Sequence, residues 1–159
     1  MADNHGHALA LINRLLFENS EPRSYATLFY AEYDYQSNRL RYANCGHLPG
    51  ILFRGAQGAH IEKLHSANTV IGLFDAWECS ISNTAMSEGD LLVLYTDGVT
   101  EAMDDDGEEF GEIRLIDVIR RNRSLPARAL AEAIGNEVIG FGGGQQYDDI
   151  TVVIAKKIR

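Results

Sequence analysis

The sequence predicts an α+β protein whose strands form a mostly antiparallel stack of sheets. Its 159 residues fit one compact domain. Short strand-like segments separated by turns fill most of the chain up to residue 95, and apolar residues at helical spacing dominate the last third. Strands grouped in one part of a chain and helices in another are typical of this fold class.

A helix and a β-hairpin are expected at the N-terminal end. Apolar residues at helical spacing predict a helix over residues 8–17, which ends before Pro22. Residues 25–35 are rich in aromatic side chains, and residues 39–43 alternate polar and apolar after a polar turn. We expect these two segments to pair as a hairpin.

The middle of the chain predicts further short strands. Residues 51–54 and 61–64 are strand-like segments between glycine-containing turns. Residues 77–82 are expected to form another strand, with an apolar face made of Trp77, Cys79 and Ile81. Residues 91–95 are apolar on both faces, which predicts a central buried strand.

The last third predicts two helices and a final strand. Residues 110–121 carry isoleucine and leucine at helical spacing. Pro126 suits the first turn of a second helix, whose apolar stripe runs to Phe141 and stops at glycines 142–144. Residues 150–155 form the closing apolar strand.

Composition narrows the classes of protein that fit. A hydrophobic fraction of 45% and a charged fraction of 23% are ordinary for a soluble globular chain. The longest nearly apolar stretch, residues 91–95, is far shorter than the ~20 residues of a spanning helix, and no signal peptide is evident. With only Cys45 and Cys79, the sequence favours a reducing cytoplasm and excludes a disulfide framework.

The charge is acidic and unevenly distributed. The formal net charge is −9, and seven acidic residues with no basic one fall within residues 101–112. Such a surface repels phosphate backbones, so nucleic acid is not an expected partner. We interpret residues 104–109 as a solvated loop; the alternative is that their acidic side chains bind cations.

Two carboxylate positions stand at strand ends. Asp97 follows the strand expected at residues 91–95, and Asp148 and Asp149 precede the strand expected at residues 150–155. If these strands pair antiparallel, Asp97 and Asp148 converge at one edge of the sheet. Like charges brought together need a cation, and oxygen ligands suit Mg²⁺ or Mn²⁺. The alternative is that Asp97 belongs to a turn and Asp148 to a loop.

Several short motifs, in order along the chain, resemble a single family. They are Asn44-Cys45-Gly46-His47, Gly89-Asp90, the run Leu94-Tyr95-Thr96-Asp97-Gly98-Val99-Thr100-Glu101-Ala102, Glu109-Phe110-Gly111 and Asp148-Asp149-Ile150-Thr151. Together they resemble the bacterial SpoIIE-like branch of the metal-dependent PPM serine/threonine protein phosphatases, which includes the sigma-B regulator phosphatases. The resemblance runs from about Leu11 to Ala155.

The resemblance implies a fold and a site. The fold would be a sandwich of antiparallel β-sheets flanked by α-helices, with a binuclear Mn²⁺ or Mg²⁺ centre. Asp97 and Asp148 would be metal ligands, and Asp149 an alternative ligand or a neighbour of the ligands. The nucleophile would be a metal-bound water, so no catalytic side chain is assigned, and no substrate-binding residue is identified.

The resemblance also implies biological partners. Substrates in the family are phosphorylated anti-sigma-factor antagonists, which carry phosphoserine or phosphothreonine. An upstream sensor or receiver domain often controls the activity. The expected setting is therefore bacterial signalling in the cytoplasm.

One departure from the family pattern matters. The family domain begins with strands ending in Gly-Gly-Asp and Asp-x-Ser-Gly-His-Gly, which supply further acidic ligands, and only Asp3 to Ala8 echoes the second of these motifs. We therefore expect residues 1–159 to form a single truncated domain without the N-terminal strands, with residues 1–7 as a flexible leader. Such a chain would be nearly inactive alone, and its uncovered sheet edge would favour a homodimer.

Two alternatives to a phosphatase are kept open. The first is a non-catalytic interaction module on the same fold. The second is a cysteine hydrolase that uses Cys45 and His47, although a buried cysteine and a turn histidine explain that pair more simply.

Overall fold

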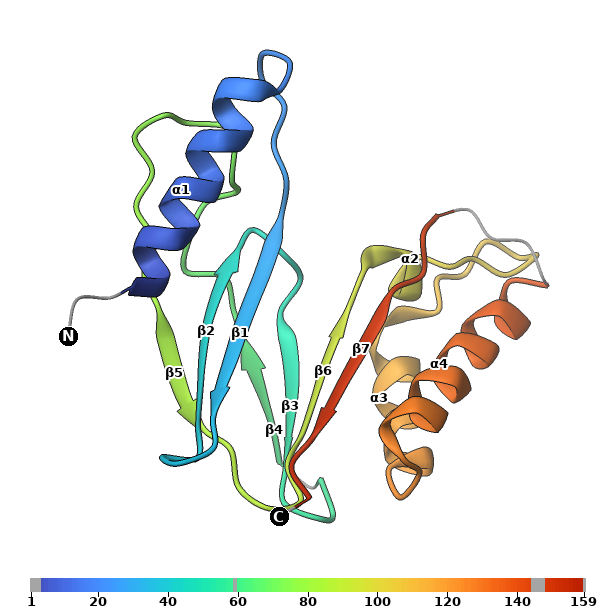
Figure 1. Cartoon of the computed structure of the whole chain (residues 1–159). Coiled ribbons are helices and arrows are strands. Elements are labelled where there is room, and N and C mark those ends of the chain that lie inside the picture. The colour runs from blue at the N-terminus through green and yellow to red at the C-terminus, as the bar shows by residue number, and fades with distance from the viewer. Residues whose placement is uncertain (1–3, 59, 144–147, 159) are drawn as a thin grey trace. The chain divides into compact units, whose positions relative to one another are not determined.

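The computed structural model describes residues 4–58, 60–143 and 148–158. The chain divides into two compact units. The first unit comprises Met1–Pro49 and Leu64–Ser87, and the second comprises Gly50–Lys63 and Glu88–Arg159. Figure 1 shows the elements of both, which are described separately below.

The first unit contains one helix and a three-stranded sheet. Its elements are α1 (Asn4–Asn19), β1 (Leu28–Asp34), β2 (Arg39–Cys45) and β5 (Ser82–Ala85). The sheet order is β1-β2-β5, and both strand pairs are antiparallel. Residues from α1, β2 and the segment before β5 form its buried cluster, which contains Leu9, Ala43, Cys45, Ile71 and Trp77.

Two predictions in the first unit are wrong. Residues 77–81 of the strand expected at 77–82 form no strand, and β5 begins only at Ser82. The main chain of Ser80 bonds to a side chain instead of a strand: the Asn68 amide donates to Ser80 O at 3.1 Å, and its Oδ1 accepts from Ser80 N at 2.6 Å. The alternation of apolar and polar residues was therefore not sufficient to predict a strand here. Helix α1 begins at Asn4, so residues 4–7 are helical and not a leader, while Met1 to Asp3 lie outside the described residues.

The second unit contains a four-stranded sheet and three helices. Its strands are β3 (Gly50–Arg54), β4 (His60–Leu64), β6 (Leu91–Tyr95) and β7 (Val152–Lys156), in the order β4-β3-β6-β7. Its helices are α2 (Asp97–Thr100), α3 (Gly111–Asn122) and α4 (Ala127–Phe141). Strand β6 lies between β3 and β7 and pairs antiparallel with both, as its two apolar faces predicted.

The two long helices are where their apolar spacing predicted them. Helix α4 packs against β7 and against α3, and Figure 1 shows these three elements side by side. The helices bury one stripe each, made of Leu115, Val118 and Ile119 in α3 and Leu130, Ile134 and Val138 in α4. Pro126 stands at the N-cap of α4 with φ −54°, which suits the start of a helix.

Antiparallel sheets combined with helices confirm the α+β fold class. The order of elements also follows the prediction, apart from residues 77–81 and the short helix α2, which the sequence reasoning missed. None of the helices in the described part of the chain has the length and apolar character needed to cross a membrane.

Candidate functional site

The two predicted carboxylate positions meet at one end of the β6–β7 pair. The register pairs Tyr95 with Val152, so the C-terminal end of β6 adjoins the N-terminal end of β7. Asp97 lies two residues beyond Tyr95, and Asp149 lies three residues before Val152. The antiparallel pairing expected from the sequence is therefore present, and it brings both acidic segments to the same edge of the sheet.

Thr96 joins these two segments directly. Its Oγ1 donates to the main-chain oxygen of Asp149 at 2.8 Å and accepts from Thr151 N at 3.0 Å. Its own N–H donates to Thr151 O at 3.1 Å. Thr96 thus connects the two chain segments where β6 ends, through its hydroxyl and its backbone N–H. These bonds hold the backbone of Asp149 close to Asp97.

Gly98 allows the segments to approach each other. A Cβ at this position would lie 2.6 Å from Asp149 O and 3.4 Å from the carbonyl carbon of Asp148. Real Cβ atoms do not come that close to backbone oxygen, so any side chain would push the two segments apart. Glycine is required here for space.

The three acidic side chains are exposed at this edge. Asp97 Oδ1 accepts from Gly98 N at 3.0 Å, and Asp148 Oδ1 accepts from Asp149 N at 2.7 Å. The main-chain oxygen of Asp97 accepts from Glu101 N at 2.8 Å, which closes the single turn of α2. The carboxylates of Asp97 and Asp148 are therefore each oriented by a neighbouring backbone N–H.

The carboxylate oxygens at this edge are the type of ligand that a hard cation prefers, but there are too few of them to complete its coordination. Carboxylate oxygens suit Mg²⁺ or Mn²⁺, which take about six oxygen ligands. Among residues 4–58, 60–143 and 148–158, no group of three or more His, Cys, Asp or Glu side chains is placed to hold a metal ion. Asp97, Asp148 and Asp149 would therefore supply part of a coordination shell, with water completing it.

The cysteine hydrolase alternative is not supported by the site of Cys45. The side chain has no exposed surface, and burial, reinforced by the neighbouring Cys79, raises the pKa of the Cys45 thiol to about 12. A thiol with this pKa stays protonated near pH 7 and is a poor nucleophile. His47 Nδ1 contacts Leu48 O at 3.1 Å, as a turn histidine would.

The acidic stretch forms a loop in which Asp104 and Glu108 have local polar contacts. Asp104 Oδ1 accepts from Asp106 N at 3.1 Å and from Glu108 N at 2.8 Å. Glu108 also pairs with Arg114 Nη2 at 2.8 Å. These contacts support the solvated-loop interpretation of residues 104–109.

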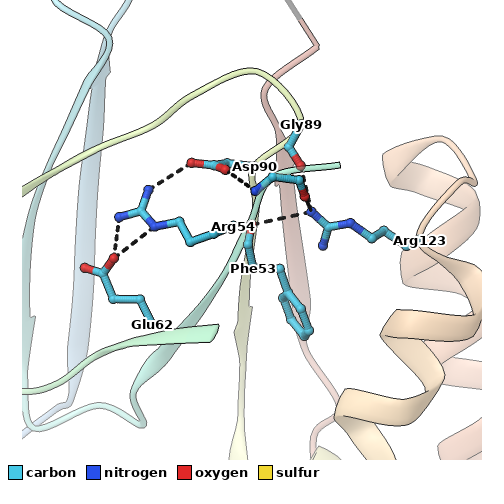
Figure 2. Close-up of polar contacts among 7 residues, drawn as sticks. Phe53, Arg54, Glu62, Gly89, Asp90 and Arg123 are labelled. Atoms are coloured by element: carbon cyan, nitrogen blue, oxygen red, sulfur yellow. Dashed lines mark hydrogen bonds and ion pairs between the residues drawn. The ribbon is translucent and has the colours of Figure 1, made fainter. Parts of the chain in front are cut away.

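Sequence reasoning missed a buried charge network at the other end of β6, shown in Figure 2. Asp90 is 2% exposed; its Oδ2 accepts from Arg54 Nη1 at 2.8 Å and its Oδ1 from Gly55 N at 2.6 Å. Arg54 Nε also donates to Glu62 at 3.0 Å. The motif Gly89-Asp90 was the only signal, and its partners, 35 and 36 positions away, could not be read from it.

Comparison with known proteins yields a family and several relatives. The family model described as Stage II sporulation protein E (SpoIIE) matches residues 3–157. Protein IcfG of Synechocystis sp. is 32% identical over 86% of this chain and 21% of its own length. Phosphoserine phosphatase RsbU of Bacillus subtilis is 24% identical over 92% of this chain and 43% of its own length. The chain thus spans less than half of either relative.

Solved structures show the same fold. A phosphatase-domain structure of the cell fate determinant SpoIIE from Bacillus subtilis, with a fragment of its regulatory domain, matches with a TM-score of 0.76, at 24% identity over 95% of this chain and 44% of that one. A second structure of that phosphatase domain, presoaked with Mn, matches with a TM-score of 0.65, at 22% identity over 99% of this chain and 68% of that one. Because the family model covers nearly the whole sequence and the fold agrees, the chain belongs to the SpoIIE family.

Proposed function

We propose that this chain is the catalytic part of a metal-dependent protein serine/threonine phosphatase. The observation that carries the proposal is the convergence of Asp97 with Asp148 and Asp149 at one sheet edge, held by the Thr96 hydroxyl. Relatives support it: RsbU is named a phosphoserine phosphatase, and a SpoIIE phosphatase-domain structure was presoaked with Mn.

In this proposal Asp97 and Asp148 hold Mn²⁺ or Mg²⁺, and Asp149 is an alternative ligand. A bound ion of this kind polarises a phosphoryl oxygen and lowers the pKa of water for in-line attack. Thr96 and Gly98 hold the two acidic segments side by side, which keeps Asp97 near the backbone of Asp149 before a cation binds. No side-chain nucleophile is required, which agrees with the buried, protonated Cys45.

The finer parts of the proposal concern the substrate and the setting. The substrate would be phosphoserine or phosphothreonine on a regulatory protein, namely an anti-sigma-factor antagonist, in the bacterial cytoplasm. A sensor or receiver domain would control the full-length protein. The similarity to RsbU, which is named a phosphoserine phosphatase, supports phosphoserine as the substrate group.

A second candidate function is a non-catalytic interaction module on the same fold. It is favoured by the small number of metal ligands, since the described residues contain no group of three His, Cys, Asp or Glu side chains that could hold a metal ion. A phosphatase should bind metal and hydrolyse its substrate through Asp97, whereas an interaction module should show no turnover that depends on Asp97.

The deciding experiment is a phosphatase assay of the full-length protein with a phosphoserine peptide, in Mn²⁺ and in EDTA. We expect turnover only with Mn²⁺, and we expect Asp97→Asn to reduce it at least about a hundredfold, because a charged ligand is lost at constant side-chain volume. Asp117→Asn is the matched control, since Asp117 is an exposed acid of α3 outside the site. Absence of metal-dependent turnover would favour the interaction module.

A further inference from the structure

Arg114, in the first turn of α3, connects the acidic loop of the second unit to the end of α4. Its Nη1 donates to the main-chain oxygens of Glu109 at 2.8 Å and Phe110 at 3.1 Å. Its Nη2 donates to the carboxylate of Glu108 at 2.8 Å. The guanidinium carbon lies 4.8 Å from the centre of the Phe141 ring, in a cation–π contact. One side chain therefore holds three consecutive residues of the loop against a second helix.

The stability of α3 alone does not explain an arginine at this position. The helix begins at Gly111, so Arg114 is its fourth residue. The N-terminal end of a helix carries partial positive charge, which makes a cation in the first turn unfavourable by up to about 1 kcal/mol. The ion pair with Glu108 adds little, because the side chain of Arg114 is 45% exposed and that of Glu108 is 67% exposed. The contacts that set Arg114 apart are those with the loop backbone and with the Phe141 ring.

The loop that Arg114 holds is the direct continuation of α2. The N–H of Phe110, one of the residues bound by Arg114, donates to Ala102 O at 2.8 Å. Ala102 follows Glu101, whose N–H donates to Asp97 O at 2.8 Å and closes the single turn of α2. A single helical turn is not stable by itself, so the position of α2 depends on the segments attached to it. A chain of backbone hydrogen bonds thus leads from Arg114 to Asp97.

The ring beneath Arg114 belongs to the element that leads to the second acidic segment. Phe141 is the last residue of α4 and stands seven positions before Asp148 in the chain. The ring of Phe110, which is 3% exposed, meets the Phe141 ring edge-on with the two centroids 5.4 Å apart. Arg114 therefore lies where the loop attached to α2 meets the end of α4.

We propose that Arg114 is a positioning residue for the candidate metal site, which fixes α2 and the carboxylate of Asp97 by holding the loop of residues 102–110 against the end of α4. Arg114 acts through the loop backbone and not by coordinating the ion. Hard cations hold their oxygen ligands at nearly fixed distances, so a small shift of α2 weakens binding. The inference rests on the proposed function, because it requires Asp97 to be a metal ligand.

The test compares Arg114→Gln with the parent in the full-length protein, by calorimetric titration with Mn²⁺ and by turnover of a phosphoserine peptide. We expect Arg114→Gln to bind Mn²⁺ about fivefold more weakly, since losing a direct hydrogen-bond partner of a ligand costs about tenfold or more and Arg114 acts from further away. Turnover should fall at limiting Mn²⁺ and recover in excess Mn²⁺, because the ligands are displaced and not removed. Arg114→Lys keeps the charge but lacks the planar fork, so its affinity should be intermediate.

Hydrogen exchange in EDTA gives a second readout that does not involve the metal. The amides of Phe110 and Glu101, which donate to Ala102 O and Asp97 O, should exchange faster in Arg114→Gln than in the parent. The amides of the β6–β7 ladder should exchange at the parental rate. Arg128→Gln is the matched control for both measurements, because Arg128 is an exposed arginine of α4 that pairs with Glu132, and it should behave like the parent.

Asp97→Asn, measured alongside, separates this proposal from the proposed function. If Asp97→Asn weakens Mn²⁺ binding but Arg114→Gln binds like Arg128→Gln, the positioning role is overturned and the proposed function stands. If Asp97→Asn leaves Mn²⁺ affinity unchanged, Asp97 is not a ligand and both proposals fail. Lower thermal stability of Arg114→Gln with parental Mn²⁺ affinity and parental exchange at Glu101 would show a purely structural role and would also overturn the inference.

Discussion

The hydroxyl of Thr96 donates a hydrogen bond to the main-chain oxygen of Asp149, 2.8 Å away and 53 positions along the chain. The same oxygen atom of Thr96 accepts from Thr151 N at 3.0 Å. Thr96 immediately precedes Asp97, so one small side chain connects the two acidic segments. The alignment of the candidate metal ligands therefore depends on a residue that does not itself coordinate a metal.

Removing the Thr96 hydroxyl should lower both the stability of the protein and its affinity for Mn²⁺. Thr96→Val keeps the shape but loses both hydroxyl contacts, so we expect a loss of about 1–3 kcal/mol in the free energy of unfolding and weaker binding of Mn²⁺. Thr96→Ser retains the hydroxyl and should restore most of both. Chemical denaturation and metal titration of the three proteins provide the measurement, and a serine variant as impaired as the valine variant would contradict it.

Gly98→Ala should be far more damaging than an alanine placed elsewhere. The new Cβ would meet Asp149 O at 2.6 Å, so the acidic segments must move apart, and metal affinity should fall together with stability. Gly135→Ala on α4 is the control, because a Cβ there meets nothing within 4 Å. That control should be neutral or gain up to about 1 kcal/mol from helix propensity. Equal tolerance of both alanines in thermal unfolding would refute the close approach as a constraint.

The 159-residue chain by itself should bind Mn²⁺ weakly and turn over phosphopeptide slowly. Asp97, Asp148 and Asp149 supply few of the about six oxygens that such an ion takes, so water would fill the remaining positions. Calorimetric titration with Mn²⁺ and a parallel phosphatase assay give the measurement. Tight binding of two ions with steady turnover would show that residues 1–159 hold a complete site.

Cys45 should make the protein sensitive to alkaline pH without affecting turnover. Its pKa is raised from about 9 to about 12 in the folded chain, so the folded state keeps its proton while the unfolded state loses it. Stability should therefore be complete below pH 9 and decline between pH 9 and 12, with a slope of up to about 1.4 kcal/mol per pH unit.

Cys45→Ala removes this titration, so its unfolding free energy should fall less steeply over the same pH range. Denaturant titrations at several pH values compare the two proteins. The variant should also retain metal-dependent turnover, because the buried thiol lies outside the proposed reaction. Loss of turnover in Cys45→Ala with Asp97→Asn unharmed would return the case to a thiol hydrolase.

Periodicity in the sequence was enough to predict α3, α4 and β6. Leu115 and Ile119, two of the residues whose spacing predicted α3, are buried, because a helix repeats every 3.6 residues whatever it packs against. Ile113 had the same spacing but is 80% exposed. The doubly apolar residues 91–95 likewise predicted a strand between two others. The same reasoning failed at residues 77–81, which form no strand. An alternating sequence pattern does not show whether a neighbouring strand is present to pair with.

The sequence by itself determined most of the element types, the family resemblance and the expectation that Asp97 and Asp148 meet, since antiparallel pairing places the end of one strand beside the start of the other. Only the tertiary structure decided how they meet, through the Thr96 hydroxyl and the space at Gly98. It also decided the pairing of Asp90 with Arg54 and the contact of Arg114 with the Phe141 ring. These contacts join residues that are tens of positions apart, and side chains so distant in the chain are placed by the folding of the whole unit, which no local pattern records.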